Sequence, residues 1–141
     1  MNNYSDLYNV KNSVAPCNLS LGKDNPISLK SKEGYAYRVT GIDQINDIIN
    51  CGYVRPKEYG VRGQNHGDII YWSIGGNVCY YDKRPVLEIS LSKVHDGQIG
   101  AIPLDDLSGI WIYDEITNSY VNKIENIKSL YVDLQDNYKH R

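Results

Sequence analysis

The side chains that most often do chemistry are sparse in this chain. It has three histidines and three cysteines in 141 residues. Neither set has the spacing of a zinc site, and an odd number of cysteines does not fit a fully paired disulfide scaffold. The sequence therefore predicts no metal site and a reducing compartment. A nucleophilic Cys51 or Cys79 would need a histidine base beside it, which no local spacing provides.

General acid-base chemistry on RNA is one function that the remaining side chains could serve. A small metal-independent ribonuclease would use His66 or His95 together with a second polar group. The candidates for that second group are Lys57, Lys93 and Tyr71. A binding module without chemistry is a further alternative.

Another kind of chemistry is indicated by the stretch "YAYRVT", residues 35–40, which alternates like a strand but ends on Arg38 and Thr40. The strand continues into a predicted helix over Ile42 to Cys51. Thr40 and Asp43 have the spacing of a capping box, and Gly52 is typical of a left-handed C-cap. The apolar face of this helix consists of Ile42, Ile45, Ile48 and Ile49.

The composition indicates one domain of ordinary size without a general affinity for nucleic acid duplexes. The net charge is −2 and the pI is near 5.9, which gives no sign of a domain-wide basic surface. There is no signal-peptide pattern and no apolar run of membrane-spanning length, so we expect no membrane partner. We expect a cytoplasmic protein, or a domain delivered into a target-cell cytoplasm as part of a larger secreted protein.

The order of the predicted elements favours an α+β fold with a mainly antiparallel sheet. Residues 1–33 are polar and are predicted to be a loosely ordered arm or linker, with the domain at 34–141. After the early helix, strands are predicted over 69–73, 85–91, 98–103 and 109–114, with a turn or single helical turn at 104–108. Glu88 is predicted to face solvent or a loop. Residues 77–81 could be a short helix or a continuation of the preceding strand. From Val121 the apolar positions predict a terminal amphipathic helix, although 130–134 could also be a strand.

Three segments resemble the ADP-ribosyltransferase family, which includes diphtheria-type toxins and poly(ADP-ribose) polymerases. The first is the strand with Arg38 and Thr40, its helix and Gly52; the second is "GDIIYWSIGGNVCYY"; the third is "GQIGAIPLDDLSGIWIYD". The resemblance spans residues 35–114. It implies a compact split β-sheet core with few helices, and NAD as the cofactor.

The resemblance also implies roles for individual residues. Gln98 falls where most members have a catalytic glutamate, Tyr71 where a tyrosine stacks on nicotinamide, and Arg38 would bind a phosphate or ribose. Further NAD contacts are expected from Tyr37, Val39, Thr40, Ser73, Tyr80 and Tyr81. A loop that meets the acceptor would carry Arg55, Lys57, Arg62 and His66.

The resemblance implies a mono-ADP-ribosyltransferase of the bacterial toxin or effector type, which modifies a protein or nucleic acid or hydrolyses NAD. A cognate immunity protein would be its partner. Glutamine at position 98 is a departure from the family, because a neutral amide stabilises a developing positive charge less well than a carboxylate. Poly-chain elongation is therefore not expected.

Overall fold

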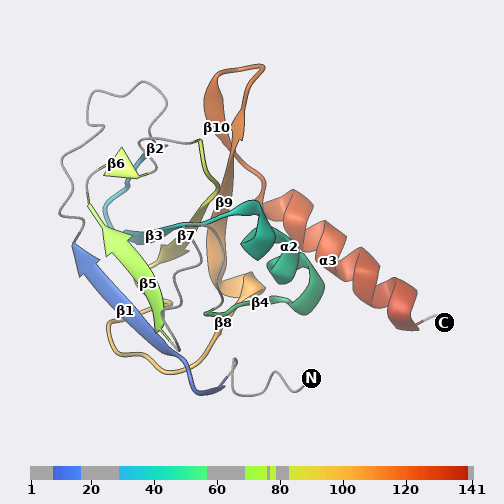
Figure 1. The fold of residues 1–141 in the computed structure, drawn as a ribbon, viewed down its shortest axis with the longest axis horizontal. Coiled ribbons are helices and arrows are strands. Elements are labelled where there is room, and N and C mark those ends of the chain that lie inside the picture. The colour runs from blue at the N-terminus through green and yellow to red at the C-terminus, as the bar shows by residue number, and fades with distance from the viewer. Residues whose placement is uncertain (1–7, 17–28, 57–68, 76, 79–82, 140–141) are drawn as a thin grey trace.

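The computed structural model describes residues 8–16, 29–56, 69–75, 77–78 and 83–139. Its centre is a six-stranded sheet in the order β1-β5-β3-β7-β9-β10 (Figure 1). The bounds of these strands are β1 Lys11–Pro16, β3 Tyr35–Val39, β5 Ile69–Ile74, β7 Val86–Ser90, β9 Leu107–Asp114 and β10 Ser119–Asn122. Only β1 and β5 pair in parallel; the other neighbours in this sheet are antiparallel. The predicted α+β class with a mainly antiparallel sheet is confirmed.

Short elements surround this sheet. They are β2 Leu29–Lys30 paired with β6 Asn77–Val78, β4 Tyr53–Val54 paired with β8 Ile102–Pro103, and the 3-10 helix η1 Leu104–Asp106. Of the two alternatives for 104–108, a turn or a single helical turn, the structure shows the helical turn. The strand predicted over 98–103 is shorter than expected, because only Ile102 and Pro103 form β8 and Ile99 makes an isolated bridge to Lys11.

The helix α2 spans Ile42–Cys51, as predicted, and ends at Gly52 in a left-handed conformation. The predicted capping box is wrong, because Gly41 is the N-cap and no side chain caps the helix. Ile42 is also not part of the buried face, since it is 59% exposed while Ile45 and Ile48 are buried.

The C-terminal segment is a helix, α3, over Ile124–Lys139, so the strand alternative for this region is wrong. Ile124 and Ile127 are buried, whereas Leu130 is largely exposed. Figure 1 shows α2 and α3 gathered at one side of the molecule, away from the β2–β6 pair. Among the described helices, none has the length and apolar character needed to cross a membrane.

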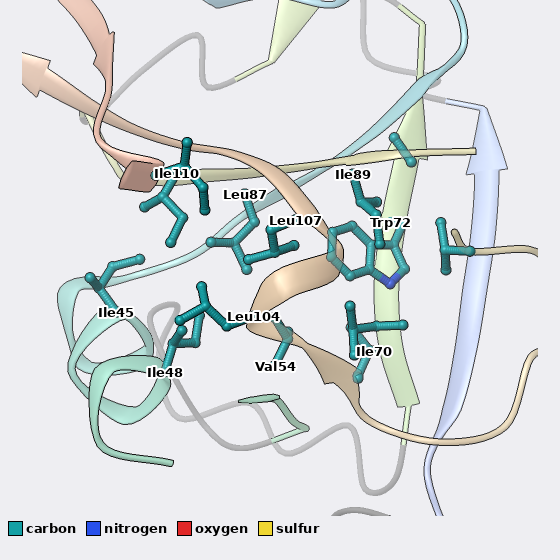
Figure 2. Packing of buried hydrophobic residues seen from close by; sticks show 14 of the residues in the cluster. Ile45, Ile48, Val54, Ile70, Trp72, Leu87, Ile89, Leu104, Leu107 and Ile110 are labelled. Carbon is teal, nitrogen blue, oxygen red and sulfur yellow. The ribbon is translucent and has the colours of Figure 1, made fainter. Parts of the chain in front are cut away.

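One face of the sheet packs against these helices and carries the main core. Alternate residues of each strand point to this face, so the cluster combines strand residues with Ile45 and Ile48 of α2 (Figure 2). Trp72 and Ile70 of β5 lie at the far end of the same cluster, as Figure 2 shows. We call this the helix face of the sheet.

The opposite face carries a second, smaller buried cluster, and we call it the tyrosine face. Tyr37 and Val86 are its fully buried members, and Leu29, Tyr35, Trp111 and Tyr120 pack against them. Leu29 belongs to β2, so the β2–β6 pair covers part of this face. Because both faces of the sheet are covered, β7 is buried along almost its whole length.

The N-terminal region is not a loose arm throughout, which corrects the prediction for residues 1–33. Six residues of β1, Lys11–Pro16, pair with β5 along its whole length, and Val10 and Asn12 are completely buried. This stretch has too few apolar residues to predict a strand from the sequence. The strand β1 is held in the sheet by its backbone pairing with β5 and by the hydrogen bonds of the Asn12 amide.

Gly52 supplies the first testable prediction, because two features of its position disfavour any side chain. Its φ is +81°, and a Cβ there would lie 2.7 Å from Cζ of Tyr131 in α3. Gly97 is a matched control, since its φ is +86° but nothing lies within 4 Å of a Cβ. We expect Gly97→Ala to cost about 1 kcal/mol of unfolding free energy and Gly52→Ala at least about 1 kcal/mol more, measured by urea denaturation. Equal losses would show that Tyr131 moves aside without cost.

Candidate functional site

A buried carboxylate lies in the middle of the tyrosine face. Glu88 of β7 is only 2% exposed, although the sequence predicted it to face solvent or a loop. The hydroxyl of Tyr37 donates to its Oε2 at 2.7 Å, and the hydroxyl of Ser108 donates to its Oε1 at 2.8 Å. Burial and this contact with Glu88 raise the pKa of the Tyr37 hydroxyl above its usual range, so Tyr37 stays a donor at neutral pH.

The strand register explains how this carboxylate fits. Ser73, Tyr37, Glu88 and Gly109 are direct cross-strand partners on four successive strands, so they form one row across the tyrosine face. A Cβ on Gly109 would lie 3.1 Å from Oε1 of Glu88 and 2.6 Å from Nε1 of Trp111. The glycine therefore makes room for both side chains. Among the described residues, the Trp111 indole nitrogen is the buried side-chain atom without a hydrogen-bond partner.

Lys32 brings a positive charge to the row. Its Nζ lies 3.5 Å from Oε2 of Glu88 and 4.5 Å from the ring centroid of Tyr35. Its backbone N–H donates to the Tyr37 hydroxyl at 3.0 Å, so the start of this side chain is fixed by the same cluster. The side chain is 56% exposed, in contrast to the buried carboxylate. The buried carboxylate of Glu88 is thus paired with a side chain that reaches solvent.

Tyr71 and Ser73 of β5 share the tyrosine face with Glu88. Ser73 is the cross-strand partner of Tyr37, and Tyr71 lies two residues before it, so both side chains project from the tyrosine face. The Tyr71 side chain is 43% exposed. With strands about 4.8 Å apart and about 3.4 Å per residue, the Cα atoms of Tyr71 and Glu88 are about 12 Å apart.

An open cavity of about 550 Å³ lies where β3 begins and where β1, β5 and β7 end. Its described lining residues are Pro16, Ser31, Lys32, Glu33, Gly34, Tyr35, Ile74, Gly75 and Leu91. The lining is largely apolar, with Lys32 between the cavity and Glu88. A cavity of this size is typical of small-ligand sites.

The side chain of Arg38 projects from the helix face of the sheet, whereas that of Tyr71 projects from the tyrosine face. Its Nε donates to Oε1 of Gln44 at 2.9 Å, and its Nη1 lies 3.4 Å from the backbone oxygen of Tyr71. Burial lowers the pKa of the guanidinium to about 10, which leaves it charged at neutral pH. Among the described residues, no carboxylate lies within ion-pair distance of it. The structure therefore does not bring the side chains of Arg38 and Tyr71 together.

Thr40 and Gln44 explain why the strand ends on polar groups. The Thr40 hydroxyl donates to Oε1 of Gln44 at 2.6 Å, and Nε2 of Gln44 donates to the backbone oxygen of Arg55 at 3.1 Å. Gln44 is completely buried. These bonds join the end of β3 to α2 and to the segment after β4, which is a structural role.

Arg55 was predicted to meet an acceptor on a surface loop, and this prediction is wrong. Its Nε and Nη2 donate to the two carboxylate oxygens of Asp47 at 2.8 and 2.6 Å, and the residue is only 7% exposed. Such a two-pronged contact fixes the arginine to α2.

Gln98 lies outside the row, beyond the edge strand β1. Its backbone oxygen accepts from the backbone N–H and the side-chain amide of Asn12, at 2.7 and 3.1 Å. Its own Oε1 accepts from the backbone of His95 at 3.0 Å. Since β1 and β5 separate it from β3, the structure does not bring Gln98 together with Tyr37 or Glu88. Its side chain stabilises the turn that covers the edge of β1.

Val39, predicted to contact NAD, ends β3 and is 39% exposed. The other remaining predicted residues divide into two groups. His95 and Lys93 lie in the exposed turn of Gln98, away from the tyrosine-face row. The residues outside the described part of the chain are Lys57, Arg62, His66, Tyr80 and Tyr81. Within the described ranges, no group of three or more histidine, cysteine or acidic side chains could hold a metal ion.

No family model, curated protein or solved structure matches this chain. The ADP-ribosyltransferase type thus stays a prediction, and the chemistry of the tyrosine face has to follow from its own residues.

The sequence around Glu88 did indicate an unusual position, but the alternation of side chains along a strand could not show that this glutamate is buried. In "PVLEISL" the glutamate is the one charged side chain inside a run that is otherwise apolar at its centre. A strand covered on one face would place it in solvent, whereas this strand is covered on both. Lys32 had no signal, because it precedes the first predicted strand in a polar stretch.

Proposed function

We propose that this protein cleaves NAD at the tyrosine face and transfers ADP-ribose to a macromolecule or to water. The observation that carries the proposal is Glu88, a buried carboxylate held by two hydroxyls and Lys32 on the same sheet face as the exposed Tyr71. A carboxylate with fixed partners in a poorly hydrated site is suited to stabilising positive charge that develops during a reaction.

In this reaction the bond between the ribose C1′ and the nicotinamide nitrogen breaks, and its electron pair leaves with nicotinamide. The sugar becomes positively charged in the transition state, and the negative charge of Glu88 would stabilise it. The Tyr71 ring would stack on the nicotinamide and hold it. An acceptor hydroxyl, amine or water then bonds to C1′ and loses a proton.

Glu88 takes the role that the sequence resemblance gave to Gln98. Two facts support this change: Gln98 is neutral and engaged in its own turn, and Glu88 shares a face with Tyr71. Arg38 is left out of the proposed site, because its side chain lies on the helix face and binds Gln44. The macromolecular acceptor and any immunity partner stay parts of the proposal without a residue assigned to them.

The experiment is to measure nicotinamide release from NAD and cleavage of RNA by the same preparation. We expect nicotinamide release and intact RNA. Tyr71→Ala should raise the NAD concentration required for half-maximal rate by roughly tenfold or more, because stacking on a base contributes about 1 to 3 kcal/mol. Tyr71→Phe is the matched control and should stay close to the wild type, since it keeps the ring.

The alternatives give different results in the same assay. A ribonuclease would cut RNA, would release no nicotinamide, and would lose its activity in His95→Ala or His66→Ala. A binding module would do neither. Either pattern would refute NAD cleavage at this face.

A further inference from the structure

Lys32 is the feature that links the buried carboxylate to the open cavity. Its ammonium lies 3.5 Å from Glu88 and its side chain lines the cavity. Its backbone N–H donates to the Tyr37 hydroxyl, so the stem starts from a fixed point, and the side chain as a whole is 56% exposed. The same side chain therefore contacts the buried carboxylate and borders the cavity.

The cavity itself suits a flat apolar group. Ile74, Leu91 and Pro16 contribute apolar walls, and Tyr35 an aromatic one. Gly34 and Gly75 also line the cavity, and nothing lies within 4 Å of the place where a Cβ would stand on either. The one positive side chain in the described lining is Lys32, and the one negative side chain is Glu33, which is exposed.

The positions of Tyr71, Glu88 and the cavity along the sheet indicate the order in which the groups of a dinucleotide would lie. Tyr71 precedes Ser73 on β5, whereas the cavity lies beyond Ser73 at Ile74 and Gly75, with Glu88 in the row between. From Tyr71 to the level of Tyr35 is about four residues of strand, or about 14 Å. An extended dinucleotide has a suitable length for this path.

We propose that the cavity binds the adenylate half of the dinucleotide and that Lys32 is a counter-ion shared between Glu88 and the ligand phosphate. In the empty site the ammonium neutralises Glu88. When a nucleotide enters, its phosphate attracts the ammonium, and Glu88 keeps only the Tyr37 and Ser108 hydroxyls. The carboxylate then has its full charge available for the sugar at the moment when substrate is bound. The choice of a nucleotide rests on the proposed function, but the binding does not depend on any turnover.

The test compares the binding of adenosine monophosphate and adenosine by calorimetry or by NMR titration. For the wild type we expect the monophosphate to bind roughly tenfold or more tightly than adenosine, as a charge-assisted contact provides. Lys32→Met should remove this preference, and Lys32→Arg should keep it. Equal binding of the two compounds by the wild type would overturn the phosphate contact.

The shared counter-ion makes a sharper prediction for Glu88→Gln, which keeps the shape of the side chain. Without the negative charge of Glu88 to compete with the phosphate, Lys32 should bind the monophosphate several times more tightly than in the wild type. In the double variant Lys32→Met/Glu88→Gln this gain should disappear. A gain that persists without Lys32 would indicate simple repulsion by Glu88, and no gain in the single variant would indicate no competition; both results would overturn the shared role.

These outcomes are separate from those of the proposed function. Lys32-dependent binding of the monophosphate without nicotinamide release from NAD would refute the reaction and support the binding site. Nicotinamide release without any phosphate preference would do the reverse.

Discussion

Asn12→Ala is expected to lower the free energy of unfolding by about 3 kcal/mol, which corresponds to a fall in melting temperature of about 10 °C for a domain of this size. The Asn12 side chain is completely buried and makes three hydrogen bonds. Its amide donates to the backbone oxygens of Gln98 and Gly100 at 3.1 and 2.9 Å, and its oxygen accepts from the Trp72 indole at 3.0 Å. Alanine would leave the buried indole N–H without its acceptor.

The neighbouring residue provides the control. Ser13→Ala changes a partly exposed side chain on the same strand and should alter stability by less than about 0.5 kcal/mol. The variant Trp72→Phe tests the bond itself, because its effect and that of Asn12→Ala should not add in the double variant. A small loss in Asn12→Ala, or strict additivity with Trp72→Phe, would show that β1 is held by its backbone ladder alone.

The same residue shows why the sequence predicted the centre of the fold better than its edge. The helix at 42–51 and the strands at 69–74 and 86–90 follow from apolar periodicity, which the structure confirms. The strand β1 has no such periodicity. It is stabilised by pairing with a strand some 58 positions later, Lys11 with Ile69, and a pairing at that distance leaves no local pattern.

The candidate site was predicted in part for a related reason. Tyr71, Tyr37 and Ser73 were named from the sequence, and the structure does place them on one face. Arg38 alternates with Tyr37, so the strand period alone puts it on the other face, and the resemblance obscured that consequence. Glu88 and Lys32 depend on what covers the tyrosine face, which is a tertiary property that no local spacing contains.

Glu88→Gln should give the largest effect on activity. The amide keeps the size of the side chain, and its oxygen and nitrogen can still pair with the Ser108 and Tyr37 hydroxyls, so the fold should be preserved. It loses the negative charge that would face the sugar in the transition state. We therefore expect the rate of nicotinamide release at saturating NAD to fall by about a hundredfold or more, with no loss of NAD affinity.

Gln98→Ala separates this proposal from the one that the sequence resemblance suggested. Both positions carry a polar side chain of the same length, but Gln98 stabilises the turn at 95–98 and lies beyond β1. We expect Gln98→Ala to leave the rate of nicotinamide release within about threefold of the wild type, since it removes no charge from the site. A reversed ranking, with a large loss in Gln98→Ala and a small one in Glu88→Gln, would move the reaction away from the tyrosine face. A loss in Glu88→Gln counts as catalytic only if its melting temperature stays near that of the wild type, because an unfolded variant would lose activity for a trivial reason.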